Sequence, residues 1–455
     1  MRFLPRIPLY SAAVAVATAG TVLLTTTPAL AQAEWNLEMA PEDERGDCIP
    51  VAAEGESLHQ WPWARTFIGL DQAQQYNRGT FEEGSKAGQP VTIAVIDSGV
   101  DARRADVFGS RLLPGYDWWD ANAKGQCDSA EDGHGTGVAA IAAGSRLGSN
   151  DDFVGVAPEA NILPIRLFAG GDGGDIEKSQ VVAKGIRDAV DNGADVINVS
   201  SVMVATQELA DAVTYATGKN VVIVAASGND TRHMDREDYK EDEKTFYPAN
   251  YPEVIAVGAH NQIGNWYEKS NFGNNLDLLA PGEGLPYPYA GGEYRTGNGT
   301  SFAAPFVAGA AALLKGEYGS EATPAWIQER LQQTAIHPPN EFNMYQGHGI
   351  LNVAAALTAP VDEAAVTSDT VSEAPTEDAS PTPIAEDDRE SIAWLDPDYD
   401  PLRTEKTIAW ASVGAAIVLV SLVLVLRKII PKGRKRGWRP GTRKADLVPV
   451  KTAAD

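Results

Sequence analysis

The middle of the sequence contains short apolar runs rich in β-branched residues, at residues 91–96, 162–167, 195–199, 221–226 and 254–257. Stretches with helical character separate several of these runs, for example at residues 179–191 and 208–218. Runs that are apolar on both faces are typical of strands buried in a parallel sheet. Because strands that alternate with helices place helices on both faces, the sequence predicts an α/β fold of three layers with a mostly parallel central sheet.

A serine opens a further helical segment. Ser301 follows a flexible Gly-Asn-Gly approach and precedes an alanine-rich stretch, in which Pro305 removes one backbone hydrogen bond near the first turn, where the cost is tolerable. A hydroxyl at a helix N-terminus lies at the positive end of the helix dipole, beside free backbone N–H groups that stabilise an oxyanion. A serine at such a place is also a common helix cap. Ser301 is therefore either a nucleophile or a cap.

Two more polar side chains lie where predicted elements begin or end. Asp97 closes the first apolar run, and open α/β sheets build their sites at the carboxyl ends of strands. The alternative is that Asp97 caps a turn with Ser98 and Gly99. His134 stands between two glycines before a small-residue helix, and it is one of only 6 histidines in the sequence. It is either a functional imidazole or an ordinary loop residue.

The order Asp97, His134, Ser301 is one of the known sequence orders of the Ser-His-Asp constellation. The carboxylate fixes the tautomer of the imidazole, and the imidazole, with an ordinary pKa of about 6.5, takes the serine proton near neutral pH. Asn229 follows the run 221–226 through a glycine, so that its amide can donate to an oxyanion. Taken alone, Asn229 is a typical turn residue.

These motifs resemble those of the subtilisin-like serine proteases over residues 61–357. The resemblance implies a subtilisin-like fold and a serine endopeptidase, with Asp97 as the acid, His134 as the base, Ser301 as the nucleophile and Asn229 in the oxyanion hole. Within that family, several segments resemble the mycosins, which are membrane-anchored subtilases associated with type VII secretion in actinobacteria; these are residues 61–64, 70–73, 113–117, 155–158 and 163–166. Protein or peptide substrates follow from the resemblance, and we expect no cofactor.

The same resemblance implies a peptide cleft lined by strand addition. It assigns substrate contacts to Gly170 and Gly171, to Ser200 and Ser201, and to Gly228. Residues 201–204 replace a glycine-rich stretch that is common in the family, so we expect side chains there to narrow the first specificity pocket and to favour cleavage at small or medium residues. The charged segment 233–244 is either a solvated surface loop or a screen beside the cleft that contacts a secretion partner.

Both ends of the sequence predict export and anchoring. Residues 1–31 begin with Arg2 and Arg6, continue with an apolar stretch and close with Ala-Leu-Ala, as expected of a signal peptide. Residues 407–426 lack charge and are long enough to cross a bilayer at about 1.5 Å per residue; the alternative is a buried core helix. Because the basic segment 427–455 follows, we expect it in the cytoplasm and the catalytic domain outside, on a single transmembrane helix in the cell membrane.

The intervening composition predicts the domain boundaries. Residues 32–79 form an N-terminal extension, which the resemblance implies stays with the enzyme, and residues 80–357 form the peptidase domain. Residues 358–406 are rich in Pro, Thr, Ser, Ala and acids, and are predicted to be a tether. The net charge is -25, from 62 acidic and 37 basic residues. Because phosphate binding needs a positive patch, this charge argues against nucleic acid as a partner.

The sequence has two cysteines, Cys48 and Cys127, both in the part predicted to be exported. Export and an even count predict a disulfide between them, worth roughly 4 kcal/mol in the entropic model of cross-linking. Two cysteines so far apart offer no ligand cluster, so no metal site is expected. The predicted anchor also fits a function of another class. In this alternative, the protein is a structural component of a membrane secretion complex, and its protease site is dispensable.

Overall fold

The computed structural model describes residue 48 and residues 63–147, 153–168, 176–236, 238–240, 244–289 and 294–360. The predicted signal peptide, transmembrane helix and basic tail lie outside these residues, as do Gly170 and Gly171, most of the N-terminal extension and all of the predicted tether after residue 360. Among the helices that are described, none is both long enough and apolar enough to cross a membrane.

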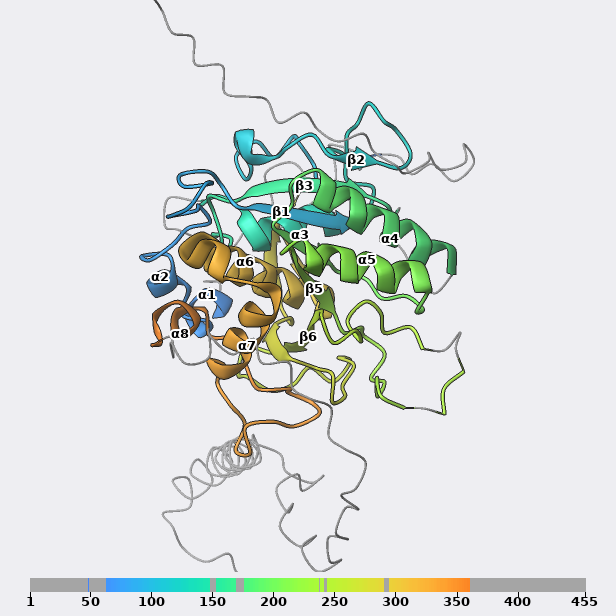
Figure 1. Ribbon diagram of the computed structural model, residues 1–455, viewed down its shortest axis with the longest axis vertical. Coiled ribbons are helices and arrows are strands. Elements are labelled where there is room, and N and C mark those ends of the chain that lie inside the picture. Colours follow the sequence, from blue (N-terminus) through green and yellow to red (C-terminus); the bar gives the residue numbers. More distant parts are fainter. Residues whose placement is uncertain are drawn as a thin grey trace, which may run out of the picture. The chain divides into compact units, whose positions relative to one another are not determined.

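A seven-stranded sheet forms the centre of the described fold, in the order β2-β3-β1-β4-β5-β6-β7 (Figure 1). Every neighbouring pair in it is parallel. Its strands are β1 (Thr92–Asp97), β2 (Tyr116–Asp117), β3 (Asn161–Arg166), β4 (Val196–Val199), β5 (Val222–Ala226), β6 (Ile255–His260) and β7 (Leu278–Pro281). The predicted α/β fold with a mostly parallel sheet is confirmed.

Helices pack on both faces of this sheet. One face carries α4 (Ile176–Asp191) and α5 (Gln207–Gly218), which lie side by side in Figure 1. The core on the other face includes residues of α1 (Trp63–Phe67), α2 (Leu70–Ala73), α3 (His134–Ala143), α6 (Thr300–Tyr318), α7 (Pro324–Gln333) and α8 (Val353–Thr358). A two-stranded antiparallel sheet of β8 (Leu285–Pro288) and β9 (Tyr294–Gly297) and the short 3-10 helices η2 (Gly109–Arg111) and η5 (Gly319–Glu321) complete the described elements.

The strands are apolar on both faces because each face meets a different helical layer. In β1, Ile93 and Val95 belong to the core beneath α3 and α6, whereas Ala94 and Ile96 belong to the core beneath α4 and α5. This explains why the sequence shows continuous apolar runs in place of an alternating pattern.

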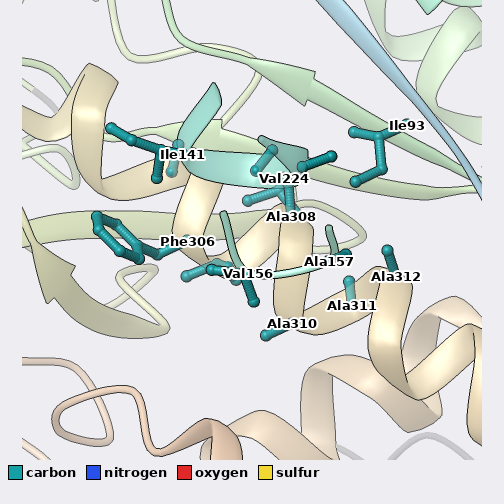
Figure 2. Close-up of a cluster of buried hydrophobic side chains, with 14 of the residues drawn as sticks. Ile93, Ile141, Val156, Ala157, Val224, Phe306, Ala308, Ala310, Ala311 and Ala312 are labelled. Atoms are coloured by element: carbon teal, nitrogen blue, oxygen red, sulfur yellow. The ribbon is translucent and has the colours of Figure 1, made fainter. Parts of the chain in front are cut away.

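Helix α6 is the central helix of its layer, and its side chains are buried from Thr300 to Gly316. It is mostly alanine and glycine where it meets the strands, so that the helix can approach the sheet closely. Figure 2 shows part of this contact, with Ala308 and Ala311 of α6 in the same cluster as Val224 of β5. The packing fixes both ends of α6 at opposite edges of the sheet.

A disulfide joins Cys48 to Cys127, with their Cα atoms 5.4 Å apart. The predicted pairing is confirmed. Cys127 is buried in the segment that leads to α3, so the bond attaches the N-terminal extension beside the candidate site.

Candidate active site

The four predicted catalytic residues line one cavity of about 460 Å³ at the carboxyl edge of the parallel sheet. Asp97 is the last residue of β1, His134 is the first of α3, and Ser301 is the second of α6. Asn229 lies just after the end of β5. Residues from four separate elements meet there because parallel strands end at the same edge.

Asp97 and His134 form a hydrogen-bonded pair. Nδ1 of His134 lies 2.8 Å from Oδ1 of Asp97, and the same oxygen accepts a hydrogen bond of 2.7 Å from the backbone N–H of Ser98. Asp97 is 3% exposed. With Nδ1 held by the carboxylate, Nε2 is the ring nitrogen left to act on a ligand.

A glycine beside His134 permits this close contact. A Cβ on Gly135 would lie 2.2 Å from the carbonyl oxygen of Gly99, so any larger residue would push α3 away from the turn that follows Asp97. The glycine therefore reflects the packing of the site as well as a permissive loop.

The pKa of His134 is raised to about 9. Burial of the ring is the largest influence and by itself lowers the pKa, but the charge of Asp97 and its hydrogen bond overcome that effect. The contact with Asp97 therefore favours the imidazolium form of His134.

Asp128 accepts hydrogen bonds from residues beside both members of this pair, and sequence analysis did not single it out. Its Oδ1 accepts a 2.8 Å hydrogen bond from Oγ of Ser98, and its Oδ2 accepts from the N–H and the hydroxyl of Thr136, at 2.8 and 2.6 Å. Asp128 thus joins the turn after Asp97 to the first turn of α3. Burial raises its pKa to about 7, against the effect of these hydrogen bonds.

Aromatic rings hold the other side of His134. The ring of Phe302 lies 5.0 Å from that of His134 and is stacked on Tyr287 at 4.9 Å. The hydroxyl of Tyr287 donates to the backbone carbonyl of Asp132 at 2.8 Å. Phe302 directly follows Ser301, so its position next to the predicted nucleophile was a signal that sequence analysis left unused.

Ser301 is not the cap of its helix. The N-cap of α6 is Gly299, with φ of 126°, and Ser301 already lies inside the first turn. A Cβ on Gly299 would lie 3.0 Å from Oδ1 of Asn229, which adds a steric reason for glycine at this position. The interpretation of Ser301 as the cap of this helix is therefore wrong.

Pro305 and Ser200 together fix the backbone of Ser301. In an α-helix the carbonyl of Ser301 would accept from the N–H of residue 305, which proline lacks. The hydroxyl of Ser200 donates to that carbonyl at 2.7 Å. The side-chain nitrogen of Asn198 in turn donates to the Ser200 hydroxyl at 2.9 Å. Asn198 in β4 and Ser200 directly after it thus replace the missing helical hydrogen bond.

The side chain of Asn229 is oriented by Thr300. Its Oδ1 accepts from the backbone N–H of Thr300 at 2.8 Å and from the hydroxyl at 3.2 Å. The Thr300 hydroxyl accepts in turn from the N–H of Gly228 at 3.1 Å. Because the oxygen of the amide is held, its Nδ2 is the group left to donate to a ligand in the cavity.

Three of the predicted substrate-binding residues line the same cavity, namely Ser200, Ser201 and Gly228. Val202 lines it too, whereas Met203 is 1% exposed and pairs through its backbone with Tyr247. Of the segment 201–204, it is therefore Ser201 and Val202 that reach the cavity. Thr245, which follows the charged segment, is also in the lining.

The fold and the cavity define an α/β protein with a carboxylate–imidazole pair and a helix-start serine at the carboxyl edge of a parallel sheet. The family model Peptidase_S8, described as "Subtilase family", matches residues 88–349. The protein belongs to the subtilase family of serine peptidases.

Curated relatives and solved structures agree with this family. Subtilisin NAT of Bacillus subtilis subsp. natto is 34% identical over 275 residues, which are 59% of this protein and 66% of the relative. The protein thus spans slightly less than two thirds of that relative's length.

Among solved structures, MycP1 from Mycobacterium smegmatis is 28% identical, with a TM-score of 0.56, covering 72% of this protein and 96% of the other. A second structure, described as a serine protease MycP1 and an essential component of the type VII (ESX-1) secretion system, is also 28% identical at a TM-score of 0.56, covering 70% and 97%.

Proposed function

We propose that this protein is a serine endopeptidase in which Ser301 is the nucleophile, His134 the general base and Asp97 the acid that orients the base. The observation that carries the proposal is the 2.8 Å contact between Nδ1 of His134 and Oδ1 of Asp97, in the cavity that Ser301 also lines. This contact directs Nε2 of His134 toward the ligand side, where it can take a proton from a hydroxyl nucleophile.

The reaction follows from these positions. Ser301 Oγ attacks the carbonyl carbon of the scissile peptide bond as its proton passes to Nε2 of His134. The oxyanion that forms is stabilised by Nδ2 of Asn229 and by the backbone N–H groups at the start of α6. His134 then gives its proton to the leaving amine, and a water molecule completes hydrolysis of the acyl-enzyme by the same steps.

Val202 and Ser201 supply a basis for restricted specificity. Both line the cavity at the position where a glycine-rich segment would leave more room, and the Cβ position of Gly228 lies 3.4 Å from a methyl group of Val202. We expect cleavage after small or medium residues. Equal cleavage after Phe and after Ala in a peptide library would contradict this, and Val202→Gly should widen the preference if it is correct.

The cellular role is proposed from the likeness to MycP1 together with the two ends of the sequence. Residues 1–31 direct export and residues 407–426 anchor the protein, so that the peptidase domain acts outside the cell membrane in association with type VII secretion. Protease digestion of intact cells, with antibodies against residues 80–357 and against residues 427–455, tests this arrangement. Protection of the peptidase domain in intact cells would contradict it.

The N-terminal extension is proposed to remain with the enzyme. Cys48 is bonded to Cys127 next to the site, so the extension is covalently attached to the peptidase domain. Sequencing of the mature N-terminus tests this: a start near Gln32 supports it, and a start near Val91 contradicts it.

A fluorophosphonate probe on the purified full-length protein tests the catalytic assignment. Labelling should map to Ser301 and should be lost in His134→Ala, since the probe reacts with an activated serine. His337→Ala, which changes an exposed histidine outside the cavity, is the matched control and should keep the labelling. Labelling that persists in Ser301→Ala would overturn the assignment.

The second candidate function is a structural part of a secretion complex. It is favoured by the description of one MycP1 structure as an essential component of a secretion system. Deletion of the gene followed by complementation separates the two functions. If Ser301→Ala restores secretion, the structural role is the essential one; if only the unaltered protein does so, proteolysis is essential.

A further inference from the structure

A second cavity lies at the amino edge of the same sheet and is larger than the one that holds Ser301. Its volume is about 570 Å³, which is within the range of small-ligand sites. Asp195 and Val221, which directly precede β4 and β5, line it. The last turns of α6 contribute Lys315.

Lys315 places a buried ammonium group in this cavity. The residue is 3% exposed, and its Nζ donates to the backbone carbonyl of Asn220 at 2.7 Å. An ammonium has three donors. Within the residues that the structure describes, the hydrogen-bond partner of Lys315 is a neutral carbonyl, and no carboxylate lies within ion-pair distance of its Nζ.

The acidic groups of the cavity are already engaged or exposed. Asp195 pairs with Lys86 at 2.5 Å through one oxygen and accepts from the N–H of Thr92 at 3.0 Å through the other. Asp191 accepts from the hydroxyl of Tyr215 at 2.5 Å.

The remaining charged groups of the lining are less confined. Glu83 is exposed, and the Nζ of Lys219 lies over the ring of Tyr215, 5.7 Å from its centre. The cavity therefore contains one buried ammonium with which no carboxylate of the lining pairs directly; the charge of Asp195 raises the pKa of Lys315, but Asp195 is itself paired with Lys86. Burial, the largest influence, lowers the pKa of Lys315 to about 8, as expected for a buried ammonium without a carboxylate at ion-pair distance.

We propose that this cavity binds a monoanionic carboxylate, carried by a small organic acid or by the C-terminus of a peptide, with Lys315 as its cation. A single buried ammonium matches a single negative charge, whereas a phosphate dianion would also face the carboxylates of Asp191 and Asp195. Phe81, Val190 and Tyr215 give the cavity an apolar side for the rest of the ligand. The site is independent of the proposed catalytic function.

Reductive methylation of lysines, followed by mass spectrometry, tests the proposal on the full-length Ser301→Ala protein at pH 8. Lys315 should react without ligand, because a fraction of its amine is uncharged. 3-Phenylpropionate should slow that reaction by about tenfold at ten times its Kd. Lys269, an exposed residue outside the cavity, is the internal control and should react at the same rate in both samples.

The neutral amide 3-phenylpropionamide should give no protection, because it lacks the charge. An N-acetylated tripeptide with a free C-terminal carboxylate, compared with its carboxamide, distinguishes the two sources. Stronger protection by the free peptide than by 3-phenylpropionate assigns the site to a peptide C-terminus, and equal or weaker protection assigns it to a small acid.

Three outcomes would overturn the proposal: a Lys315 that is unreactive without ligand, a Lys315 that neither acid protects, or protection that the amides reproduce. In a second measurement, 3-phenylpropionate should raise the Tm of the Ser301→Ala protein and lose this effect in Ser301→Ala with Lys315→Met. A Tm rise of equal size in both proteins would also contradict the proposal.

Discussion

The two cavities lie at opposite edges of one sheet, and they differ in how their buried charged groups are paired. At the carboxyl edge, the carboxylate of Asp97 has a partner in His134, and a further buried carboxylate, Asp128, is surrounded by donors. At the amino edge, Lys315 is buried against a neutral carbonyl. The buried carboxylates of the first cavity are thus paired within the protein, whereas the buried ammonium of the second has no carboxylate paired with it.

Helix α6 connects the two cavities. Ser301 is in its first turn and Lys315 is near its end, which places them about 21 Å apart along an axis that rises 1.5 Å per residue. The helix dipole favours negative charge at its start, where the proposed reaction would form an oxyanion, and positive charge at its end, where Lys315 lies. The two ends of α6 thus favour charges of opposite sign. Because Ser301 and Lys315 are far apart along the helix, a substitution at one cavity should leave the other cavity unchanged.

The largest effect is expected from Ser301→Ala. Removal of the nucleophile should lower kcat/KM for a chromogenic peptide by about 10⁴-fold or more. Lys315 should be methylated at the same rate in this variant as in the unaltered protein, because the other end of α6 is undisturbed. An active Ser301→Ala enzyme would refute the catalytic assignment, and a changed Lys315 rate would break the independence of the two edges.

Asn229→Ala should be next in size. It removes the amide that faces the oxyanion, so kcat should fall by roughly 10² to 10³ with little change in KM. Steady-state kinetics measures kcat and KM separately. Asn274→Ala changes an exposed asparagine outside the cavity and should match the unaltered enzyme; a fall caused mainly by KM would assign Asn229 to substrate binding.

The pH dependence should follow His134. A protonated imidazole cannot accept the serine proton, and the folded pKa is about 9, so kcat/KM should rise with pH and level off above that value. At pH 7 it should be about 10²-fold below the plateau, since each pH unit below the pKa costs about tenfold. A profile that is flat between pH 6 and 9 would contradict the role of the Asp97–His134 pair.

Asp128→Asn should have a smaller effect and should lower kcat by about tenfold. The amide keeps the size of the side chain but removes a negative charge that helps to raise the pKa of His134. The rising limb of the profile of kcat/KM against pH should therefore move to lower pH, a change that loss of stability alone would not produce. If kcat falls while the limb stays in place, Asp128 acts only on packing.

The two edges of the sheet also differ in how many of their site residues can be predicted from the sequence. Asp97, His134 and Ser301 each lie at or near the start or end of an element and within two residues of a glycine, so their places in a parallel α/β fold follow from local patterns. Asp128 contacts Ser98 and Thr136, and Tyr287 contacts the carbonyl of Asp132. No local sequence pattern predicts these contacts. Lys86 and Asp195 are separated by 109 positions, and Lys315 and Asn220 by 95, so only folding brings them together.

The smallest effect on catalysis, and the sharpest test of the second cavity, is expected from Lys315→Met. Turnover should change by less than about twofold, because Lys315 is remote from the reacting groups. The stability should change instead. The folded pKa of about 8 lies below the ordinary value of 10.5, so the unfolded state binds more protons between these values, and the free energy of unfolding should rise with pH there.

The gain over that window should approach about 3 kcal/mol and should be absent from Lys315→Met, with both proteins carrying Ser301→Ala to prevent self-digestion. Urea unfolding at about pH 7.5 and about pH 10.5 measures it. Saturating 3-phenylpropionate should reduce the gain, because a bound carboxylate favours the protonated amine. If Lys315→Met and its parent show the same dependence on pH, the ammonium at the amino edge is already matched by charge, and the difference between the two cavities disappears.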